Sequence, residues 1–409
     1  MRIRDSIRKC RWARVAIGVL FTIGGLGTVT VPALAQQTRE EELATAQAAK
    51  ATDLHPWVPS SAERRIAMIT RLMVPRVGWY PFIGSVFPGG SVAAGPGYRS
   101  VFGGSGGFDV HVARSVKSFS AGETLVTLPD ISSGRVQVAL LANWTDAPRV
   151  RFYGIGPASL DRNETLLPYR ATTVGGSVHV NLARLVAVGG TIGYLDVQRS
   201  GPAPDEGPEP HVFSSSNVPG LGATPAFVRT HAFAQVDSRL SPGYATSGGL
   251  YRIDWSRYAT SGNGPYSFAR YDAEVVQLIP LFRENWVIAL RALQSVTQTS
   301  AGNAVPYFLM PDLGGGGSLR GYPSWRFRDR SRTLFGAEYR WMANRFLEMA
   351  LFSDAGTVAS RLRGIRRSNL HTSFGVGGRL HSPAATMLRV DLARTSEGLG
   401  LVVAFGPSF

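Results

Sequence analysis

An arginine, Arg320, stands within a glycine-rich segment, residues 314–322, that by itself resembles a flexible linker. Two carboxylates, Glu338 and Asp354, follow on the next two stretches of alternating polar and apolar residues. Both fall on the positions expected to face the lumen, so a loop folded back inside could bring Arg320 to them. A guanidinium in a partly dehydrated lumen needs such partners, and its fork of donors can serve two carboxylates. The pattern predicts an ion-paired lock between a loop and the adjacent strands.

The other motifs with chemical potential are weaker. The run from Gly103 to Gly107 satisfies the G-x-S-x-G pattern, with Ser105 as its serine. That pattern needs a strand–turn–helix context, and here it falls in a glycine-rich hairpin turn, so no catalytic residue is expected. The seven histidines show no metal-ligand spacing, and none of Lys9, Lys50 and Lys117 belongs to a phosphate-binding loop. We therefore predict no enzymatic activity, no metal and no cofactor.

The elements that must position Arg320 and its partners are expected to be strands. With 44% hydrophobic residues, 17% charged residues and 47 glycines, the chain suits a barrel with one lipid-facing and one lumen-facing surface. Ile253 and Trp255 alternate with Arg252 and Asp254, as in a transmembrane strand. A soluble sandwich would alternate too, with its apolar face inward. No apolar run of 18 residues follows residue 35, so no membrane-spanning helix is expected.

The lengths of the expected connections favour the membrane barrel over the sandwich. Strands are expected at 75–87, 90–101, 108–119, 122–129, 134–145, 167–181, 185–197, 228–240, 247–258, 266–280, 285–298, 332–344, 346–357, 369–381, 385–395 and 398–409. Short connections alternate with a set that contains all the long ones: 146–166, 198–227, 259–265, 299–331 and 358–368. Short periplasmic turns alternating with longer external loops are typical of outer-membrane barrels. The predicted fold is all-β: a transmembrane antiparallel β-barrel of about 16 strands over residues 75–409.

The N-terminal residues have the features of a secretory signal. Residues 1–35 combine six basic residues, an apolar run and an Ala33-Leu34-Ala35 cleavage pattern, which predicts a cleaved signal peptide. Cleavage would remove Cys10, the only cysteine, and would lower the formal net charge from +15 to +10 by removing the six cations and Asp5. Residues 36–74 are predicted to form a short periplasmic segment. The remaining basic residues are scattered, which argues against a nucleic-acid partner.

The C-terminal residues alternate in the same way as the other strands. Leu401, Val403, Phe405 and Phe409 share one parity of the last expected strand, and the chain ends on that phenylalanine. This predicts a last strand that runs to the end of the chain with these side chains on its lipid face.

Several of these motifs together resemble one family of membrane proteins. Leu319-Arg320-Gly321-Tyr322 is similar to the tip of the sixth external loop in the BamA/TamA outer-membrane assembly factors, the bacterial surface antigen superfamily. Glu338-Tyr339-Arg340 and Phe352-Ser353-Asp354-Ala355-Gly356 resemble motifs of the two following strands, and the terminal Phe409 resembles the signal read by the assembly machinery. The resemblance implies that Arg320, Gly321 and Tyr322 pack in the lumen against Glu338, Asp354 and Gly356. Residues 36–80 are too few for a periplasmic POTRA domain, so the chain resembles a barrel-only subgroup.

The resemblance implies a factor that helps outer-membrane proteins, or lipids, to insert or cross. The expected partners are outer-membrane lipids, the barrel assembly machinery for the protein's own insertion, and unfolded outer-membrane or secreted clients. Two alternatives use the same residues: a passive channel or transporter gated by the Arg320 loop, and a structural barrel that anchors exposed loops. Glycines 89, 90, 95, 97, 398 and 400 are expected to weaken the first and last strands and so loosen the seam between them.

Overall fold

The computed structural model describes residues 77–201, 213–241, 243–262, 264–281, 285–344, 346–381 and 385–409, together with residues 42, 44–48, 61 and 64. The chain divides into two units, Met1–Ser60 and Ser61–Phe409. In the first unit, residues 44–48 are helical. The predicted signal peptide and most of the predicted periplasmic segment lie outside the described residues. The second unit contains all the strands.

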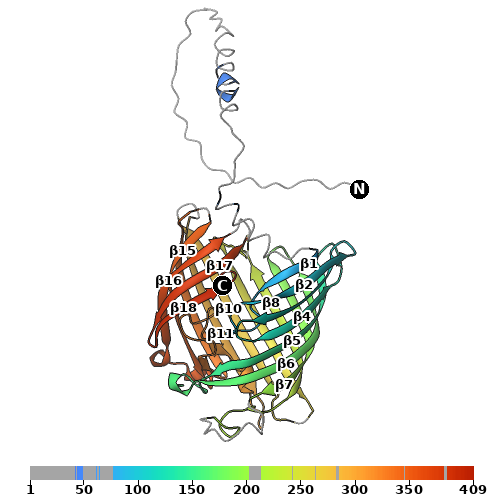
Figure 1. Ribbon diagram of the computed structural model, residues 1–409, viewed down its shortest axis with the longest axis vertical. Coiled ribbons are helices and arrows are strands. Elements are labelled where there is room, and N and C mark those ends of the chain that lie inside the picture. Colours follow the sequence, from blue (N-terminus) through green and yellow to red (C-terminus); the bar gives the residue numbers. More distant parts are fainter. Residues whose placement is uncertain are drawn as a thin grey trace, which may run out of the picture. The chain divides into compact units, whose positions relative to one another are not determined.

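Sixteen of these strands form one antiparallel sheet in sequence order, from β1 at one end to β18 at the other (Figure 1). They are β1 (Gly78–Gly84), β2 (Ala93–Phe102), β3 (Gly106–Ser115), β4 (Ser120–Thr127), β5 (Val136–Phe152), β6 (Thr165–Asn181), β7 (Val186–Ser200), β8 (Ala226–Asp237), β9 (Gly248–Ser261), β10 (Phe268–Leu281), β11 (Trp286–Thr299), β14 (Ser331–Met342), β15 (Leu347–Ala359), β16 (His371–His381), β17 (Thr386–Thr395) and β18 (Gly398–Ala404). The prediction of an all-β barrel with about 16 strands is confirmed.

The alternation of side chains along each strand separates an outer from an inner face. In β9, Ile253 is 62% exposed on the outside, while Arg252 and Asp254 pair with each other on the inside at 2.7 Å. Apolar side chains without polar partners suit contact with lipid, and paired charges suit a closed lumen. Within the described residues no helix is both long enough and apolar enough to cross a membrane.

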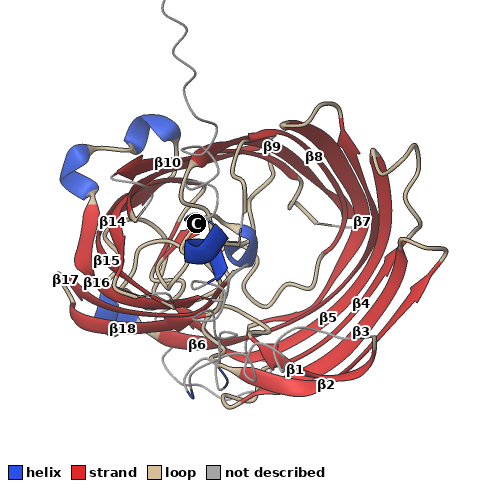
Figure 2. Ribbon diagram, turned by 90° about the horizontal axis from the view of Figure 1, so that it is seen from above, coloured by secondary structure: helices blue, strands red, loops and turns tan. Residues whose placement is uncertain are grey.

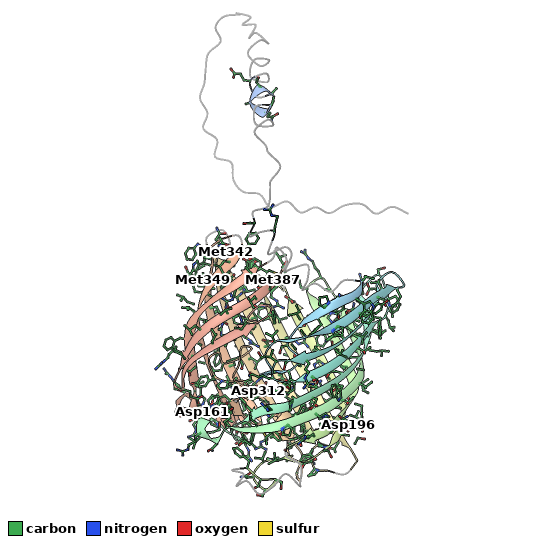
Figure 3. The ribbon with its side chains drawn as sticks, viewed as in Figure 1. Asp161, Asp196, Asp312, Met342, Met349 and Met387 are labelled. Atoms are coloured by element: carbon green, nitrogen blue, oxygen red, sulfur yellow. The ribbon has the colours of Figure 1, made fainter. Side chains whose placement is uncertain are left out.

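The connections between strands differ sharply between the two ends of the barrel. Residues 153–164, 201–225 and 300–330 join strands at one end, whereas residues 103–105, 182–185 and 343–346 join them at the other. Met342, Met349 and Met387 mark the end with short turns, and Asp161 and Asp196 mark the opposite end (Figure 3). By the usual asymmetry of outer-membrane barrels, the long loops face outward and the short turns face the periplasm.

The longest connection, residues 300–330, folds into the ring of strands (Figure 2) and is called the inner loop below. It contains a 3₁₀ turn, η2 (Tyr307–Leu309), and two short paired strands, β12 (Asp312–Leu313) and β13 (Phe327–Arg328). Leu313, Leu319 and Phe327 are almost completely buried and pack with residues of β11, β14 and β15. Burial of this apolar surface fixes the path of a segment whose glycines would otherwise leave it flexible.

A second apolar cluster lies at the outward end of the barrel. Phe227, Tyr258 and Phe268 pack with residues of the inner loop. Tyr307 donates a hydrogen bond to the Ser200 carbonyl at 3.1 Å. Burial raises the pKa of Tyr307 to about 12, so this hydroxyl keeps its proton and remains a donor at neutral pH.

The largest differences from the expected strand boundaries are at the ends of β5 and β18. β5 continues to Phe152 instead of ending at residue 145, because Pro148 lies in a bulge between Ala147 and Val150 and the pairing with β6 resumes beyond it. β18 ends at Ala404 instead of residue 409. Gly406 adopts a φ of +83° and Pro407 has no N–H to donate, so the chain leaves the sheet at this point.

Candidate functional site

The inner loop carries Arg320 into contact with the inner wall of the barrel. The Arg320 side chain is 2% exposed. Its Nε donates to Asp354 Oδ2 at 2.7 Å and its Nη2 donates to Asp354 Oδ1 at 2.7 Å, so the two groups meet through a bidentate contact. Its Nη1 donates to Glu338 Oε1. The structure thus brings together the three charged residues that the sequence pattern singled out.

Further charged residues surround this contact, and of these only Arg340 belongs to a motif noted in the sequence. Glu338 also accepts from Arg340 Nε at 2.6 Å and lies 2.9 Å from Arg379 Nη2. Arg389 lies 3.3 Å from Asp391, whose other neighbour is Arg320 at 3.8 Å. Arg379, Arg389 and Asp391 sit at inward positions of β16 and β17, so their parity was the signal available in the sequence. We call Arg320 and these partners the lumen lock.

An aromatic ring completes the environment of the guanidinium. The Arg320 Cζ lies 3.6 Å from the centroid of the Phe352 ring, which is a cation–π geometry. Phe352 faces Glu338 across the β14–β15 pair. The guanidinium is therefore held by carboxylates at its edges and by a ring on its face. Isolated buried charges are costly, whereas charges paired in this way are tolerated.

Glycines allow the inner loop to approach the strands closely. Gly321 has a φ of +87°, and a Cβ there would lie 2.7 Å from Ala393 Cβ. A Cβ on Gly400 of β18 would lie 2.3 Å from the Gly321 carbonyl oxygen. A Cβ on Gly356 would lie 2.9 Å from the Thr333 oxygen and 3.0 Å from Leu313. The loop, β18 and β15 thus meet where there is no room for a methyl group.

Tyr322 anchors the loop beyond Arg320. It is 3% exposed, and its hydroxyl lies 2.9 Å from Ser396 Oγ in the turn between β17 and β18. Its ring packs against Phe327 with the centroids 5.3 Å apart. All six residues predicted for the loop-to-lumen contact, Arg320, Gly321, Tyr322, Glu338, Asp354 and Gly356, therefore lie along the path of the inner loop.

The C-terminal residues differ from the expectation. Leu401 and Val403 lie on the outer face, 68% and 54% exposed, as predicted. Phe405 and Phe409 lie beyond the end of β18. The Phe409 ring lies 5.7 Å from Arg291 Cζ and 5.2 Å from Arg340 Cζ, so it faces the interior of the barrel and not lipid.

Replacing Phe409 with alanine should destabilise the periplasmic end of the lumen modestly. The change removes two cation–π contacts, each worth about 0.5–1 kcal/mol, and the packing of the ring near Leu278 and Val287. We expect the midpoint of heat-modifiability on gels to fall by a few degrees after refolding in vitro. Phe409→Tyr retains the ring and is the control. Equal midpoints for the alanine and tyrosine variants would contradict this role.

The tip of the first hairpin is held by the inner loop. Trp325 has a φ of +68°, stacks on Phe87 with the centroids 5.7 Å apart, and donates from Nε1 to the Pro88 carbonyl at 3.2 Å. Phe87 and Pro88 belong to the turn between β1 and β2. The inner loop therefore contacts the β1 side of the barrel through Trp325 and the β18 side through Gly321.

A cavity of about 1270 Å³ lies beside this loop. Its wall includes Gly84 and Ser85 at the end of β1, residues 401–405 at the edge of β18, and residues 314–318 of the inner loop. Because Leu401 and Val403 point outward, the cavity reaches the outer surface between the two terminal strands of the sheet. The two ends of the strand order therefore border a common space.

The weaker motifs form no reactive arrangement in the described part of the chain. Ser105 lies in the turn between β2 and β3, where its Oγ accepts a hydrogen bond from the Asp130 N–H at 2.8 Å. Among the described residues, no group of three or more His, Cys, Asp or Glu side chains is placed to hold a metal ion. The charged side chains that the fold brings together in the lumen and its loops form ion pairs.

A 16-stranded antiparallel sheet with a lipid-facing outer surface and a loop locked in its lumen defines an outer-membrane β-barrel. Residues 235–397 match the family model of the Omp85 superfamily domain. The fold is similar to a crystal structure of BamA from Haemophilus ducreyi that lacks POTRA domains 1–3, with a TM-score of 0.61 and 13% identity over 80% of this chain and 70% of that chain. A comparison with curated proteins gives no match.

The fold is thus that of an outer-membrane β-barrel, and its residues 235–397 are similar to the Omp85 superfamily domain. The resemblance to the BamA/TamA superfamily is thereby confirmed. The matched residues include β9 to β17, and so contain Arg320, Glu338 and Asp354.

Proposed function

We propose that this barrel assists the insertion or translocation of outer-membrane proteins or lipids through the seam between β1 and β18. The observation that carries the proposal is the cavity beside the inner loop, whose wall includes the ends of both terminal strands. A space bordered by two strand edges and open toward lipid is a physical route from the lumen into the membrane. An exposed strand edge can also template the pairing of an incoming strand.

The lengths of the terminal strands support this proposal. β1 and β18 have seven residues each, against 17 in β5. In the described residues β1 and β18 are not hydrogen-bonded to each other, so the sheet ends at two short strands whose outer edges are unpaired. The inner loop adds a means of control, because it contacts the β1–β2 turn through Trp325 and β18 through Gly321.

Glycines near the first and last strands were expected to weaken strand pairing, but those of β2 have a different role. Gly89 and Gly90 lie in the turn between β1 and β2. A Cβ on Gly97 of β2 would lie 2.4 Å from the Tyr80 ring, and one on Gly95 would lie 1.9 Å from the Val112 oxygen. These glycines make room for close neighbours. The proposed opening therefore rests on the strand lengths and the cavity.

Fixing the seam should abolish activity. The protein loses its only cysteine if the signal peptide is cleaved, so Ser85→Cys with Val403→Cys would provide the only two thiols. We expect bis-maleimide linkers of graded length to join the two strand ends. In liposomes, the shortest linker that reacts should stop the barrel from accelerating the folding of an unfolded outer-membrane protein.

The control joins two strands that are already paired. Val390 and Val403 are register partners on β17 and β18, so Val390→Cys with Val403→Cys carries the same linker away from the seam. Full acceleration with the seam cross-linked would sink the proposal. A barrel that does not accelerate folding but gives a stable conductance would support the alternative, a channel gated by the Arg320 loop.

Export and assembly complete the proposed function. The predicted signal peptide, residues 1–35, would direct the chain across the inner membrane. The barrel assembly machinery would then read the terminal pattern of Leu401, Val403, Phe405 and Phe409 on the unfolded chain. A signal read before folding does not require that Phe409 face lipid in the final structure.

A further inference from the structure

The cavity at the proposed seam has a marked excess of positive charge. Six cationic side chains and two carboxylates line it. The cations are Lys117, Arg149, Arg151, Arg291, Arg332 and Arg389, and the carboxylates are Glu164 and Asp312. A concave surface with one dominant sign of charge attracts ligands of the opposite sign.

Most of these cations are already engaged. Arg151 pairs with Glu164 at 3.1 Å, and Arg291 pairs with Glu274 at 2.8 Å. Arg332 donates to the Asp312 carbonyl at 2.9 Å. These groups have little capacity left to bind a further anion.

Lys117 and Arg149 are the exceptions. Both are exposed, and neither has an ion-pair partner among the described residues. Lys117 donates a hydrogen bond to the Gly89 carbonyl at 3.2 Å. They belong to the turn between β3 and β4 and to β5, at the outward end of the short strands. Two unpaired cations therefore stand at the rim of the cavity.

The wall next to these cations is apolar and faces outward. Val116, next to Lys117, is 82% exposed, and Leu166 is 50% exposed. Across the opening, Leu401 and Val403 of β18 are also exposed. All four line the cavity. The site thus combines free cations with an apolar surface open to the membrane, which suits a ligand with an anionic head and hydrocarbon chains.

We propose that this cavity binds an anionic phospholipid, with its phosphate at Lys117 and Arg149 and an acyl chain along Val116, Leu166, Leu401 and Val403. This lipid would be a ligand of the seam between β1 and β18, so the assignment rests on the proposed function. The lipid would lie between the edges of β1 and β18 and keep them separated. A client strand would have to displace the lipid before it could pair with either edge.

Lipid retention in native mass spectrometry tests the assignment with the full chain. The probes are phosphatidylglycerol and phosphatidylcholine with the same acyl chains, with inorganic phosphate as a competitor. We expect the wild type to retain phosphatidylglycerol in preference to phosphatidylcholine. Lys117→Gln with Arg149→Gln should weaken retention about thirtyfold, since each cation near an anionic headgroup contributes on the order of 1 kcal/mol.

The matched control removes two exposed arginines elsewhere. Arg363→Gln with Arg366→Gln changes the loop between β15 and β16, which does not line the cavity, and should leave retention unchanged. Equal retention by the Lys117/Arg149 variant and the wild type would overturn the proposal. So would displacement of the lipid by an equal concentration of inorganic phosphate, which would indicate a free-anion site. Retention is measured without a client, so its loss or persistence is independent of insertion activity.

Discussion

Replacing Arg320 with alanine should produce the largest loss of stability of any single change in the lumen. The substitution leaves the buried Asp354, 3% exposed in its side chain, without its bidentate partner, and it removes one of the three arginine contacts of Glu338. Breaking a buried ion pair in this way costs about 3–5 kcal/mol, because an uncompensated charge remains. We expect a clear fall in the midpoint of heat-modifiability, with the barrel still able to fold.

The comparison variants separate the lock from a general loss of charge. Arg363→Ala removes an exposed arginine of an external loop and should have little effect. Adding Asp354→Asn to Arg320→Ala should cost less than the sum of the two single changes, because the second change removes the carboxylate charge that the first leaves unpaired. A midpoint for Arg320→Ala equal to that of the wild type would refute the lock. The same variant in the liposome assay would show whether the proposed activity depends on it.

Replacing Gly400 with alanine should disturb the contact between the inner loop and β18. The added Cβ would lie 2.3 Å from the Gly321 carbonyl oxygen, a backbone atom that cannot rotate away. Forcing a methyl group into such a contact typically costs 1–3 kcal/mol. The loop or the strand must move, so both the heat-modifiability midpoint and the protection of residues 314–322 from proteolysis should fall.

Gly378→Ala is the matched control for this change. Gly378 lies in β16, and the nearest atoms to a Cβ there are 3.9 Å away, an ordinary contact distance. The two variants therefore differ in local space and not in chemistry. If Gly400→Ala and Gly378→Ala behaved alike, the close approach of the loop to β18 would not matter for stability.

Much of this architecture was predictable because strand alternation is a local property of the sequence. The number of strands and the position of the longest loop follow from the period-two pattern and its interruptions. Arg320, Glu338 and Asp354 were identifiable because the two carboxylates share a parity and Arg320 lies in a glycine-rich segment. Their neighbours Arg379 and Asp391 also occupy inward positions of their strands. The local sequence does not indicate which of the inward charges the loop will contact.

The features that sequence alone did not reveal depend on contacts between distant residues. Phe409 continues the parity of Leu401 and Val403, yet Gly406 and Pro407 end the strand and the ring turns inward to Arg291 and Arg340. Glycines 95 and 97 looked like weak points, and their neighbours across the sheet show that they are points of close packing. Alternation predicts which face a residue occupies, but not how far a strand continues or what packs against it.

The partners of Arg320 in the lumen lock come from several strands, and this should affect how long the folded barrel persists. Arg320 meets carboxylates of β14, β15 and β17, and Asp354 is 34 residues away in the sequence. These contacts can form only after the strands have paired, so they come late in folding. Interactions that are absent from the transition state do not speed folding, but they slow unfolding. The lock should therefore act as a kinetic latch that keeps an assembled barrel assembled.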